Sequence, residues 1–337
     1  MTPPGKHRMN LSNISRNTAV SLSQQARQVW ITVNPKAGSG TKGHLVSQLA
    51  DRLRERNFEV KLMSDVDQLA EQSQQSWNTG SLRAVVAAGG DGTVGHVVNR
   101  LTSGIPLCVL PLGTENLLAK YLQLPADTTS LAEIIEQGCT VRLDAGSANG
   151  RLFLLMLSCG LDAEVVRRVH SQRRGNITHI AYAKPILESL RTYKYPKLTI
   201  RVEGRDQEPH PPPKEIESRW IFVVNLPRYA RGLQLMPDAV GTDGMLDVCA
   251  FLGGNWWNSL RYLGGVLAGQ HRQWADCQTF QTSRLHIAAD SEVPYQIDGD
   301  PGGVLPVDIE ILPAHITCVV SSSWAQDNGF AFQNTPL

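Results

Sequence analysis

The sequence lacks any long hydrophobic run. None of its 337 residues falls in a segment of 18 consecutive apolar residues, so we expect no transmembrane helix. Basic residues lie near the N-terminus, but no apolar stretch follows them, which argues against a signal peptide. The net charge is only +1 and provides no overall field that would attract nucleic acid. These absences predict a cytoplasmic protein with no nucleic-acid partner.

Paired cysteines are also missing. The six cysteines lie far apart in the chain and form no Cys-x-x-Cys motif. Several are in apolar runs, as Cys108 is between Leu107 and Val109. We therefore expect buried free thiols in a reducing compartment and no zinc site.

The most informative stretch is a glycine-rich turn between two apolar patterns. Residues 84–88 are an apolar run of strand length, and the apolar spacing over residues 94–101 is that of a helix. Such a turn can direct backbone N–H groups at a phosphate, and a carboxylate in it suits Mg²⁺ or a hydroxyl. An ordinary strand-to-helix turn is the alternative. The turn residues are Gly89, Gly90, Asp91, Gly92 and Thr93.

A second glycine-rich turn, residues 34–43, follows an expected strand at 29–33 and opens an expected helix. It lacks the Walker A spacing. A flexible linker is the alternative, but α/β proteins place ligands at this kind of turn. Its candidate cofactor-binding residues are Asn34, Lys36, Gly38, Gly40 and Lys42.

A third turn follows the expected strand 106–110 and contains Gly113, Thr114 and Asn116. Strands alternate with helices throughout this half of the chain, which predicts a parallel sheet. Because the carboxyl ends of parallel strands share one edge, the three turns should converge on one site. The expected strands are residues 29–33, 58–63, 84–88 and 106–110, and further helices are expected at about 66–77 and 117–122.

In order and spacing, the three turns resemble the catalytic domain of the diacylglycerol kinase family, which includes soluble bacterial lipid kinases and sphingosine kinases. The resemblance covers residues 29–320. It implies ATP and Mg²⁺ as cofactors and an α/β N-terminal domain with the three-layer parallel sheet of NAD kinases and phosphofructokinases. Bacterial members usually have Asp where this chain has Leu117, so any role of that Asp in a magnesium network is missing or filled elsewhere.

After about residue 140 the pattern changes to short strands, which predicts a mostly antiparallel β-sandwich as the C-terminal domain. The family resemblance implies that the last strand, about 315–320, returns to the first domain. The expected organisation is a disordered tail at 1–27, a nucleotide-binding domain at 28–140 plus about 315–325, a lipid-substrate domain at 141–314, and a tail at 326–337.

Residues 237–248 contain an Asp-Gly pair that could simply be a hairpin turn. The longer pattern resembles the family's structural magnesium loop. By that resemblance, the side chain of Asp243 and the backbone carbonyls of Val240 and Met245 would hold the ion, and oxygen-only ligation suits Mg²⁺.

A second Asp-Gly pair precedes Asp300, where the family has Asp-Gly-Glu. The resemblance makes Asp298 the general base and gives Asp300 a catalytic role, with a side chain one methylene shorter than Glu. Asp91 would then organise magnesium and phosphate. In NAD kinases the residue matching Asp91 is the base instead, so both assignments stay open.

Membrane contact is suggested by charge. Residues 161–201 contain nine basic and three acidic residues, which could attract an anionic bilayer, although a solvated helix face is the blander alternative. For Trp256 and Trp257 we expect core packing.

These features predict a kinase that transfers the γ-phosphate of ATP to a hydroxyl of a lipid such as diacylglycerol or a sphingoid base. The partners would be that lipid and, peripherally, the inner membrane face. The alternatives are an NAD-kinase-like small-molecule kinase and a non-catalytic protein that binds nucleotide or lipid.

Overall fold

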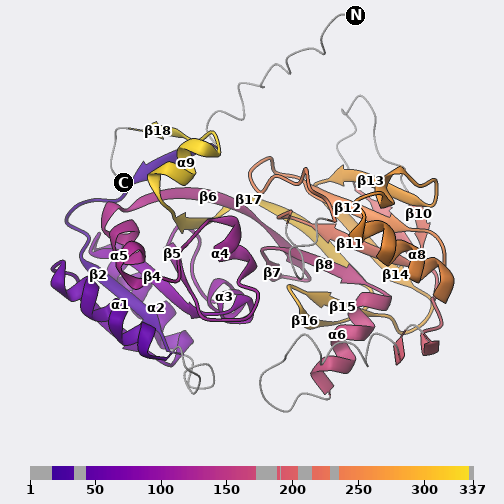
Figure 1. The fold of residues 1–337 in the computed structure, drawn as a ribbon, viewed down its shortest axis with the longest axis horizontal. Coiled ribbons are helices and arrows are strands. Elements are labelled where there is room, and N and C mark those ends of the chain that lie inside the picture. The colour runs from indigo at the N-terminus through magenta and orange to yellow at the C-terminus, as the bar shows by residue number, and fades with distance from the viewer. Residues whose placement is uncertain are drawn as a thin grey trace, which may run out of the picture.

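The computed structural model describes residues 17–33, 43–171, 188–189, 191–203, 215–227 and 235–333. Figure 1 shows two lobes side by side, one formed by the N-terminal part of the chain and the other by most of the C-terminal part. Within these described ranges, no helix is both long and apolar enough to cross a bilayer.

The first lobe is built on a parallel sheet with the strand order β5-β4-β2-β3. All eight residues of its central strand β4 are buried, so both faces of the sheet are covered at this point. The four predicted strands are confirmed to within two residues at each end. They are β2 (Gln28–Thr32), β3 (Glu59–Met63), β4 (Leu82–Gly89) and β5 (Pro106–Pro111).

Helices connect these strands and pack on the sheet. The buried residues Val46, Leu49 and Leu53 of α1 follow helical spacing, which explains why this segment forms an amphipathic helix. Asp65 caps α2 by accepting hydrogen bonds from two backbone N–H groups. The helices of this lobe are α1 (His44–Glu55), α2 (Val66–Asn78), α3 (Asp91–Val98), α4 (Leu117–Tyr121) and α5 (Thr128–Gln137).

Two long strands, β6 (Cys139–Ala148) and β17 (Val307–Val319), run from one lobe into the other (Figure 1). They pair antiparallel over their length, with a break in register between Leu312 and Ile316. The final residues of β17 also pair in parallel with β5, so the end of the chain completes the first sheet.

The second lobe is a sandwich of two antiparallel layers. One layer is the six-stranded sheet β13-β12-β11-β8-β15-β16, and the other is β10-β9-β14 together with the start of β17. A hydrophobic cluster fills the space between the layers. The remaining strands of this lobe are β7 (Arg151–Phe153), β8 (Met156–Cys159), β9 (Leu198–Val202), β10 (Glu215–Ser218), β11 (Trp220–Val224), β12 (Leu246–Phe251), β13 (Cys277–Thr282), β14 (Arg284–Ala289), β15 (Pro294–Ile297) and β16 (Asp300–Val304). The architecture confirms the predicted fold class.

The helices α6 (Leu161–Ser171) and α8 (Trp256–Leu267) and the 3₁₀-helix η4 (His271–Gln273) also belong to this lobe. Tyr262 of α8 stacks on Phe251 of the six-stranded sheet with ring centroids 4.3 Å apart. The expectation that Trp256 and Trp257 pack in the core is wrong, since both side chains are exposed. They lie on the side of α8 that faces away from the sheet.

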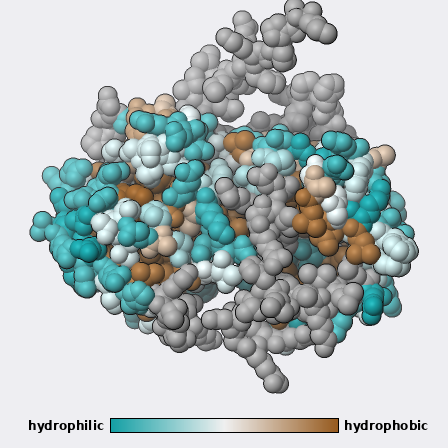
Figure 2. Space-filling view, in the orientation of Figure 1, coloured by the Kyte–Doolittle hydropathy of each residue, from teal (hydrophilic) through white to brown (hydrophobic). Residues whose placement is uncertain are grey.

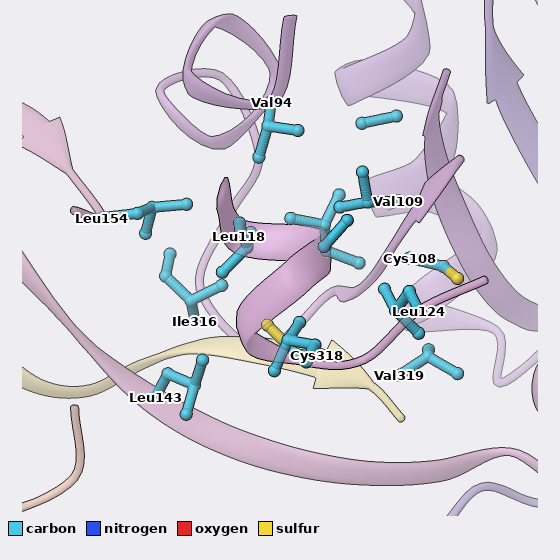
Figure 3. Packing of buried hydrophobic residues seen from close by; sticks show 14 of the residues in the cluster. Val94, Cys108, Val109, Leu118, Leu124, Leu143, Leu154, Ile316, Cys318 and Val319 are labelled. Atoms are coloured by element: carbon cyan, nitrogen blue, oxygen red, sulfur yellow. The ribbon is translucent and has the colours of Figure 1, made fainter. Parts of the chain in front are cut away.

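The first lobe's core extends to the strands that join the lobes. Figure 3 shows Leu118 of α4, Ile316 of β17 and Leu154 together, with Cys318 and Leu143 beneath the helix. All five side chains are buried. The six cysteines are free and buried, as predicted. Helix α4 therefore rests on residues from three distant parts of the chain.

The predicted disorder of residues 1–27 is wrong for residues 17–27, and the expected tail at 326–337 contains a strand. Strand β1 (Thr18–Ser21) pairs in parallel with β18 (Ala331–Gln333), and α9 (Ser322–Asp327) precedes β18. The buried guanidinium of Arg83 donates to the carbonyls of Leu22 and Ser23 at 3.2 and 3.0 Å. These bonds hold the N-terminal segment against β4, although its polar composition is typical of a tail.

Candidate active site

Two glycine-containing loops meet at the carboxyl ends of β4 and β5. A Cβ added to Gly113 would lie only 2.5 Å from Cα of Gly90, so the two backbones are in direct contact. The N–H of Leu112 donates to the carbonyl of Gly89 at 3.0 Å. A Cβ on Gly89 would lie 2.3 Å from Oγ1 of Thr93. A side chain at Gly113 would therefore force the loops apart, and one at Gly89 would displace Thr93 within the first loop.

Asn116 braces the second loop. Its side-chain Oδ1 accepts from the N–H of Gly113 at 2.8 Å, and its Nδ2 donates to the carbonyl of Gly113 at 2.9 Å. The backbone of Asn116 is in the left-handed region, with φ of 52°, which Asn tolerates better than most residues. Asn116 thus shapes the loop, while Thr114 between these residues is exposed.

Asp91 is the first residue of α3, directly after the Gly90 cap. Its Oδ1 accepts from the N–H of Leu118 at 3.3 Å, which links the first glycine loop to the start of α4. Burial raises the pKa of Asp91, and hydrogen bonds from the N–H groups of Leu118 and Leu117 act against that rise. At position 117 the chain therefore offers a backbone donor to Asp91, and the Leu117 side chain is buried in the core.

Asp298 occupies the tight turn between β15 and β16. Asp298 and Gly299 both have positive φ, 50° and 87°, as in a two-residue type I′ hairpin. The Asp298-Gly299 pair therefore forms a β-hairpin turn. In addition, the Asp298 carboxylate accepts three backbone hydrogen bonds at 2.8–2.9 Å, from Leu154, Leu155 and Met156.

The surroundings of Asp298 make its proton affinity unusual for a carboxylate. Burial raises the pKa of Asp298 to about 6. The three N–H donors lower it, and the negative charge of Asp91 raises it further. Asp298 and Asp91 are thus close enough to interact, although they belong to different lobes. A carboxylate with a pKa near neutrality is suited to take up and release a proton.

Asp300 begins β16 and has two basic neighbours. Its Oδ1 lies 3.3 Å from Nε2 of His170 in α6, and its Oδ2 lies 4.0 Å from a guanidinium nitrogen of Arg151. A Cβ placed on Gly92 would be 3.6 Å from Oδ2 of Asp300. Asp300 therefore faces the start of α3 across the space between the lobes.

These groups line one cavity of about 210 Å³. One wall is α3 and the other is formed by β7 and the turn between β15 and β16. The cavity brings together the three predicted catalytic residues and Gly92. Its lining residues are Asp91, Gly92, Gly95, His96, Asn99, Arg100, Arg151, Leu152, Ile297, Asp298 and Asp300.

Asn99 fixes the width of this cavity. Its side-chain Nδ2 donates to the carbonyl of Leu152 at 3.0 Å, and its Oδ1 accepts from the N–H of Leu152 at 2.8 Å. This two-way bond joins the C-terminal end of α3 to β7. The glycine loop and the Asp298 turn are therefore held at a fixed separation in this structure.

The basic side of the cavity, formed by His96, Arg100 and Arg151, was not predicted from the sequence. Arg151 lies in the cavity because β6 and β7 are joined by a two-residue turn at Asn149 and Gly150, both with positive φ. Asn-Gly is the strongest short hairpin signal, so this turn could have been predicted. Its proximity to Asp300 could not, because the two residues are far apart in sequence.

The predicted magnesium loop lies elsewhere, before β12. The N–H of Met245 donates to Oδ1 of Asp243 at 2.9 Å, and the N–H of Asp243 is 3.4 Å from the carbonyl of Val240. Burial raises the pKa of Asp243 to about 6, and the charge of Asp144 contributes to the rise. Oδ2 of Asp144 accepts from the N–H of Gly244 at 2.7 Å.

The candidate ligands of this loop are the Asp243 carboxylate and the backbone carbonyls of Val240 and Met245. They suit a hard divalent cation, because all are oxygen atoms and the nearby acidic side chains favour positive charge. The pKa of Asp247 is also raised to about 6, mainly by burial and then by the charge of Asp243. Over the described residues, no group of three or more His, Cys, Asp or Glu side chains is arranged to hold a metal. The predicted site depends instead on one carboxylate and backbone carbonyls.

Five predicted cofactor-binding residues fall outside the described part of the chain. These are Asn34, Lys36, Gly38, Gly40 and Lys42. The strand before them, β2, and the helix after them, α1, are described, and β2 pairs with β4 in parallel. The carboxyl end of β2 is therefore at the same sheet edge as Gly89.

Comparison with known proteins gives consistent matches over most of the chain. The family model for the diacylglycerol kinase catalytic domain matches residues 28–148, and the model for the YegS C-terminal NAD kinase beta sandwich-like domain matches residues 156–320. A Bacillus subtilis protein named diacylglycerol kinase is 25% identical over 308 residues, which cover 89% of this chain and 98% of that protein. A Staphylococcus epidermidis protein with the same name is 27% identical over 240 residues, 69% of this chain and 72% of its own length.

Solved structures agree with this assignment at the level of the fold. A Bacillus anthracis structure described as a diacylglycerol kinase is 19% identical and has a TM-score of 0.60, with 88% of this chain and 98% of that chain covered. Another Bacillus anthracis structure has 22% identity and a TM-score of 0.66, with 88% and 98% covered. The chain therefore belongs to the diacylglycerol kinase catalytic-domain family of phosphotransferases.

Proposed function

We propose that the protein is an ATP-dependent lipid kinase, which transfers the γ-phosphate to a hydroxyl of a lipid such as diacylglycerol or a sphingoid base. The observation that carries this proposal is the cavity between the lobes. It places Asp91, at the start of a glycine-loop helix, and Asp298, a carboxylate with a pKa of about 6, on facing walls. Family membership and the names of the relatives support the same activity.

In this proposal the nucleotide is held at the sheet edge. Gly89, Gly90, Gly92 and Thr93 form the turn at the N-terminus of α3, where backbone N–H groups and the helix dipole favour phosphate. The contact between Gly90 and Gly113 adds the second loop, whose shape Asn116 maintains. The candidate residues Asn34, Lys36, Gly38, Gly40 and Lys42 would complete the site from the end of β2.

Asp298 is the proposed general base. Its three backbone donors fix the carboxylate and occupy three of about four acceptor positions, which leaves one for the acceptor hydroxyl. As the oxygen of that hydroxyl bonds to phosphorus, its proton passes to the Asp298 carboxylate, and ADP leaves with the electrons of the broken bond. Arg151 and Arg100 line the same cavity and would neutralise phosphate charge.

Mg²⁺ has two proposed positions. Asp91 would hold the ion that accompanies the nucleotide, and when bound it would neutralise charge on the phosphate oxygens. Asp243, with the carbonyls of Val240 and Met245, would hold a structural ion in the second lobe. Tyr121 of α4 bonds to the backbone of Gly241, so this loop is linked to the helix that supports Asp91.

The domain division predicted above remains part of the proposal, with nucleotide in the first lobe and lipid in the second. We further propose that the protein works in the cytoplasm and reaches its lipid at the inner membrane face. A lipid acceptor resides in a bilayer, so the cavity must be presented to one.

The first experiment measures ATP consumption and product formation with Mg²⁺ and mixed micelles. The acceptors are diacylglycerol, monoacylglycerol, sphingosine and ceramide, with NAD as a soluble control. Asp298→Asn should lower turnover by about 10²–10⁴-fold. Asp290→Asn is the matched control, since Asp290 is exposed and lies outside the cavity.

An Asn at position 298 would turn its amide hydrogens toward at least one backbone N–H, so thermal unfolding of the variant must accompany the assay. A phosphorylated lipid that disappears in a folded Asp298→Asn variant supports the proposal. Turnover of NAD in place of lipid would assign the base to Asp91. No turnover by the folded wild type with any acceptor would favour a binding protein.

A further inference from the structure

The outward face of α8 is unusually apolar for a surface helix. Trp256, Leu260, Leu263 and Leu267 follow the spacing i, i+4, i+7 and i+11, which places them on one side of the helix. All four are exposed, and Trp257 beside them is 65% exposed. Figure 2 shows hydrophobic side chains gathered over the region of α8. We call these five side chains the α8 stripe.

The α8 stripe is not the face through which α8 packs on its own lobe. The helix packs on its lobe through Ser259, Tyr262 and Gly265, which are buried. A Cβ on Gly265 would lie 2.2 Å from the ring of Trp274, so the helix approaches its support closely. Of the three buried residues two are small and one, Tyr262, is aromatic, whereas the apolar residues Trp256, Leu260, Leu263 and Leu267 face outward.

The two tryptophans have the properties of an interfacial anchor. Trp256 and Trp257 stack on each other with ring centroids 3.8 Å apart, at the first turn of α8. Tryptophan is enriched where membranes meet water, because the ring is apolar and its N–H can remain hydrated. Single exposed apolar residues are normal on protein surfaces, whereas these five lie next to one another on one helix and include two tryptophans.

Charge around the stripe matches an anionic surface. Residues 255–274 contain no Asp or Glu, but the exposed Arg261 and Arg272 among them form ion pairs with Asp276 and Asp238, so the positive charge offered beside the stripe comes from Arg191 and Lys194. The exposed Arg191 and Lys194 belong to a segment that is fastened to the start of α8. The Tyr195 hydroxyl bonds to the Ser259 side chain, and Arg219 donates to the carbonyl of Tyr195 at 2.9 Å.

The size of the stripe distinguishes a bilayer from a second copy of the chain. Twelve residues at 1.5 Å each make a helix about 18 Å long. With a width of about 10 Å, its face is roughly 180 Å², far below the ~800 Å² that each partner buries in a stable dimer. An interfacial helix, by contrast, needs only to insert its apolar face about 5–10 Å into the headgroup region.

We infer that the α8 stripe, with Arg191 and Lys194 beside it, docks the protein on an anionic lipid bilayer. This inference deepens the proposed function and rests on it for the need to reach a lipid. Helices α6 and α8 belong to the same lobe as Asp298, and His170 of α6 contacts Asp300 at the cavity. Docking through α8 would therefore hold the lobe that carries the proposed base against the membrane that contains the acceptor.

The test measures sedimentation of the full chain with phosphatidylcholine vesicles, with and without phosphatidylglycerol. The docking variant is Trp257→Glu/Leu267→Glu, and the matched control is Leu62→Glu/Phe332→Glu, two exposed apolar residues of the first lobe. We expect the docking variant to bind phosphatidylglycerol vesicles about tenfold more weakly or worse, and the control to bind like wild type. Arg191→Glu/Lys194→Glu should weaken binding only to the anionic vesicles.

Equal binding of the docking variant and wild type would overturn the inference, as would absence of wild-type binding. A wild-type dimer that the docking variant dissociates, measured by light scattering, would assign the stripe to a second copy and also overturn it. Turnover of a short-chain, monomeric acceptor separates the two proposals. If the short-chain acceptor is still phosphorylated but the docking substitutions do not change vesicle binding, only the docking inference is rejected. If vesicle binding requires the stripe but no acceptor is phosphorylated, the kinase proposal alone fails.

Discussion

Oδ1 of Asp300 lies 3.3 Å from Nε2 of His170, which connects the turn beside Asp298 to the C-terminal end of α6. Oδ2 of the same carboxylate is 4.0 Å from Arg151. The side chain that is one methylene shorter than the family's Glu therefore still contacts a partner on each side. Asp300 therefore positions His170 and Arg151 beside the cavity. The contribution of Arg151 can be measured by substitution.

Arg151→Met should lower kcat/KM on the order of a hundredfold, because it removes a cation from the cavity in which phosphate charge is transferred. Stability should change little, since Arg151 is largely exposed. Arg142→Met on β6 is the control, as Arg142 is exposed and lies outside the cavity. Unchanged steady-state kinetics in Arg151→Met would mean that phosphate is not transferred next to this residue.

The activity should depend on pH through Asp298. Its pKa is raised to about 6, and only the ionised carboxylate can accept the hydroxyl proton. We therefore expect kcat/KM to rise as pH increases through about 6 and then to level off. The contribution of Asp298 to stability runs the other way. The folded protein binds this proton more tightly than the unfolded chain does, so stability falls as pH rises from about 4 to 6.

A pH–rate profile and urea unfolding over the same range check both signs. Asp290→Asn should reproduce the wild-type profile. A flat profile between about pH 5 and 8, which brackets the Asp298 pKa of about 6, would be incompatible with Asp298 as the base.

Gly113→Ala should raise the KM for ATP and lower the melting temperature. The added Cβ would lie 2.5 Å from Cα of Gly90 and 2.8 Å from Oδ1 of Asn116, so the two loops must separate. Backbone atoms cannot rotate away as a flexible side chain can. Gly264→Ala is the control, because nothing lies within 4 Å of its added Cβ and alanine favours a helix by about 0.5–1 kcal/mol. Equal effects of the two substitutions would show that the loop contact is unimportant.

Asp243→Asn should change the response of stability to Mg²⁺. In EDTA the variant should be at least as stable as wild type, because the raised pKa of Asp243 means that its buried charge is unfavourable without a cation. In Mg²⁺ the wild type should gain melting temperature and the variant should gain much less. Asp238→Asn in the same loop, where Asp238 is exposed, should behave like wild type. A Mg²⁺ response that survives in Asp243→Asn would place the ion elsewhere.

Arg83→Met should lower the free energy of unfolding on the order of 3 kcal/mol, because buried carbonyls lose their charged donor. The guanidinium donates to the carbonyls of Ile135 and Glu136 on α5 and of Leu22 and Ser23 before β2. The exposed Arg54, paired with Asp51, provides the control, and Arg54→Met should cost at most about 0.5 kcal/mol. Urea unfolding measures both values, and similar losses would contradict a structural role for the buried guanidinium.

The strands and the glycine loops could be predicted because their signals are local. Residues 84–88 are apolar on both faces, as a strand inside a parallel sheet must be, and β4 is indeed wholly buried. Asp91 and Asp298 could be assigned to one site only through the family resemblance. Nothing local connects them, since their proximity depends on β6 and β17 and on the bond between Asn99 and Leu152.

Two predictions from composition were wrong, because the burial of a side chain depends on tertiary contacts that composition does not reveal. Trp256 and Trp257 were expected in the core on composition, but Ser259 and Gly265 occupy the inward face of α8 instead. The N-terminal segment was expected to be disordered on composition, yet Arg83 and β18 hold it in place. For the N-terminal segment the decisive partners are distant in sequence, since β18 is near the other end of the chain.

Because β6 and β17 run through both lobes, the N-terminal part of the chain lacks a complete sheet when it is expressed alone. A fragment that ends after β6 would lack β17, the parallel neighbour of β5 and the antiparallel neighbour of β6. Two strand edges in its main sheet would then be open to pairing with other chains. We expect such a fragment to aggregate when expressed alone, and the full chain to melt in a single cooperative transition although two family models divide it.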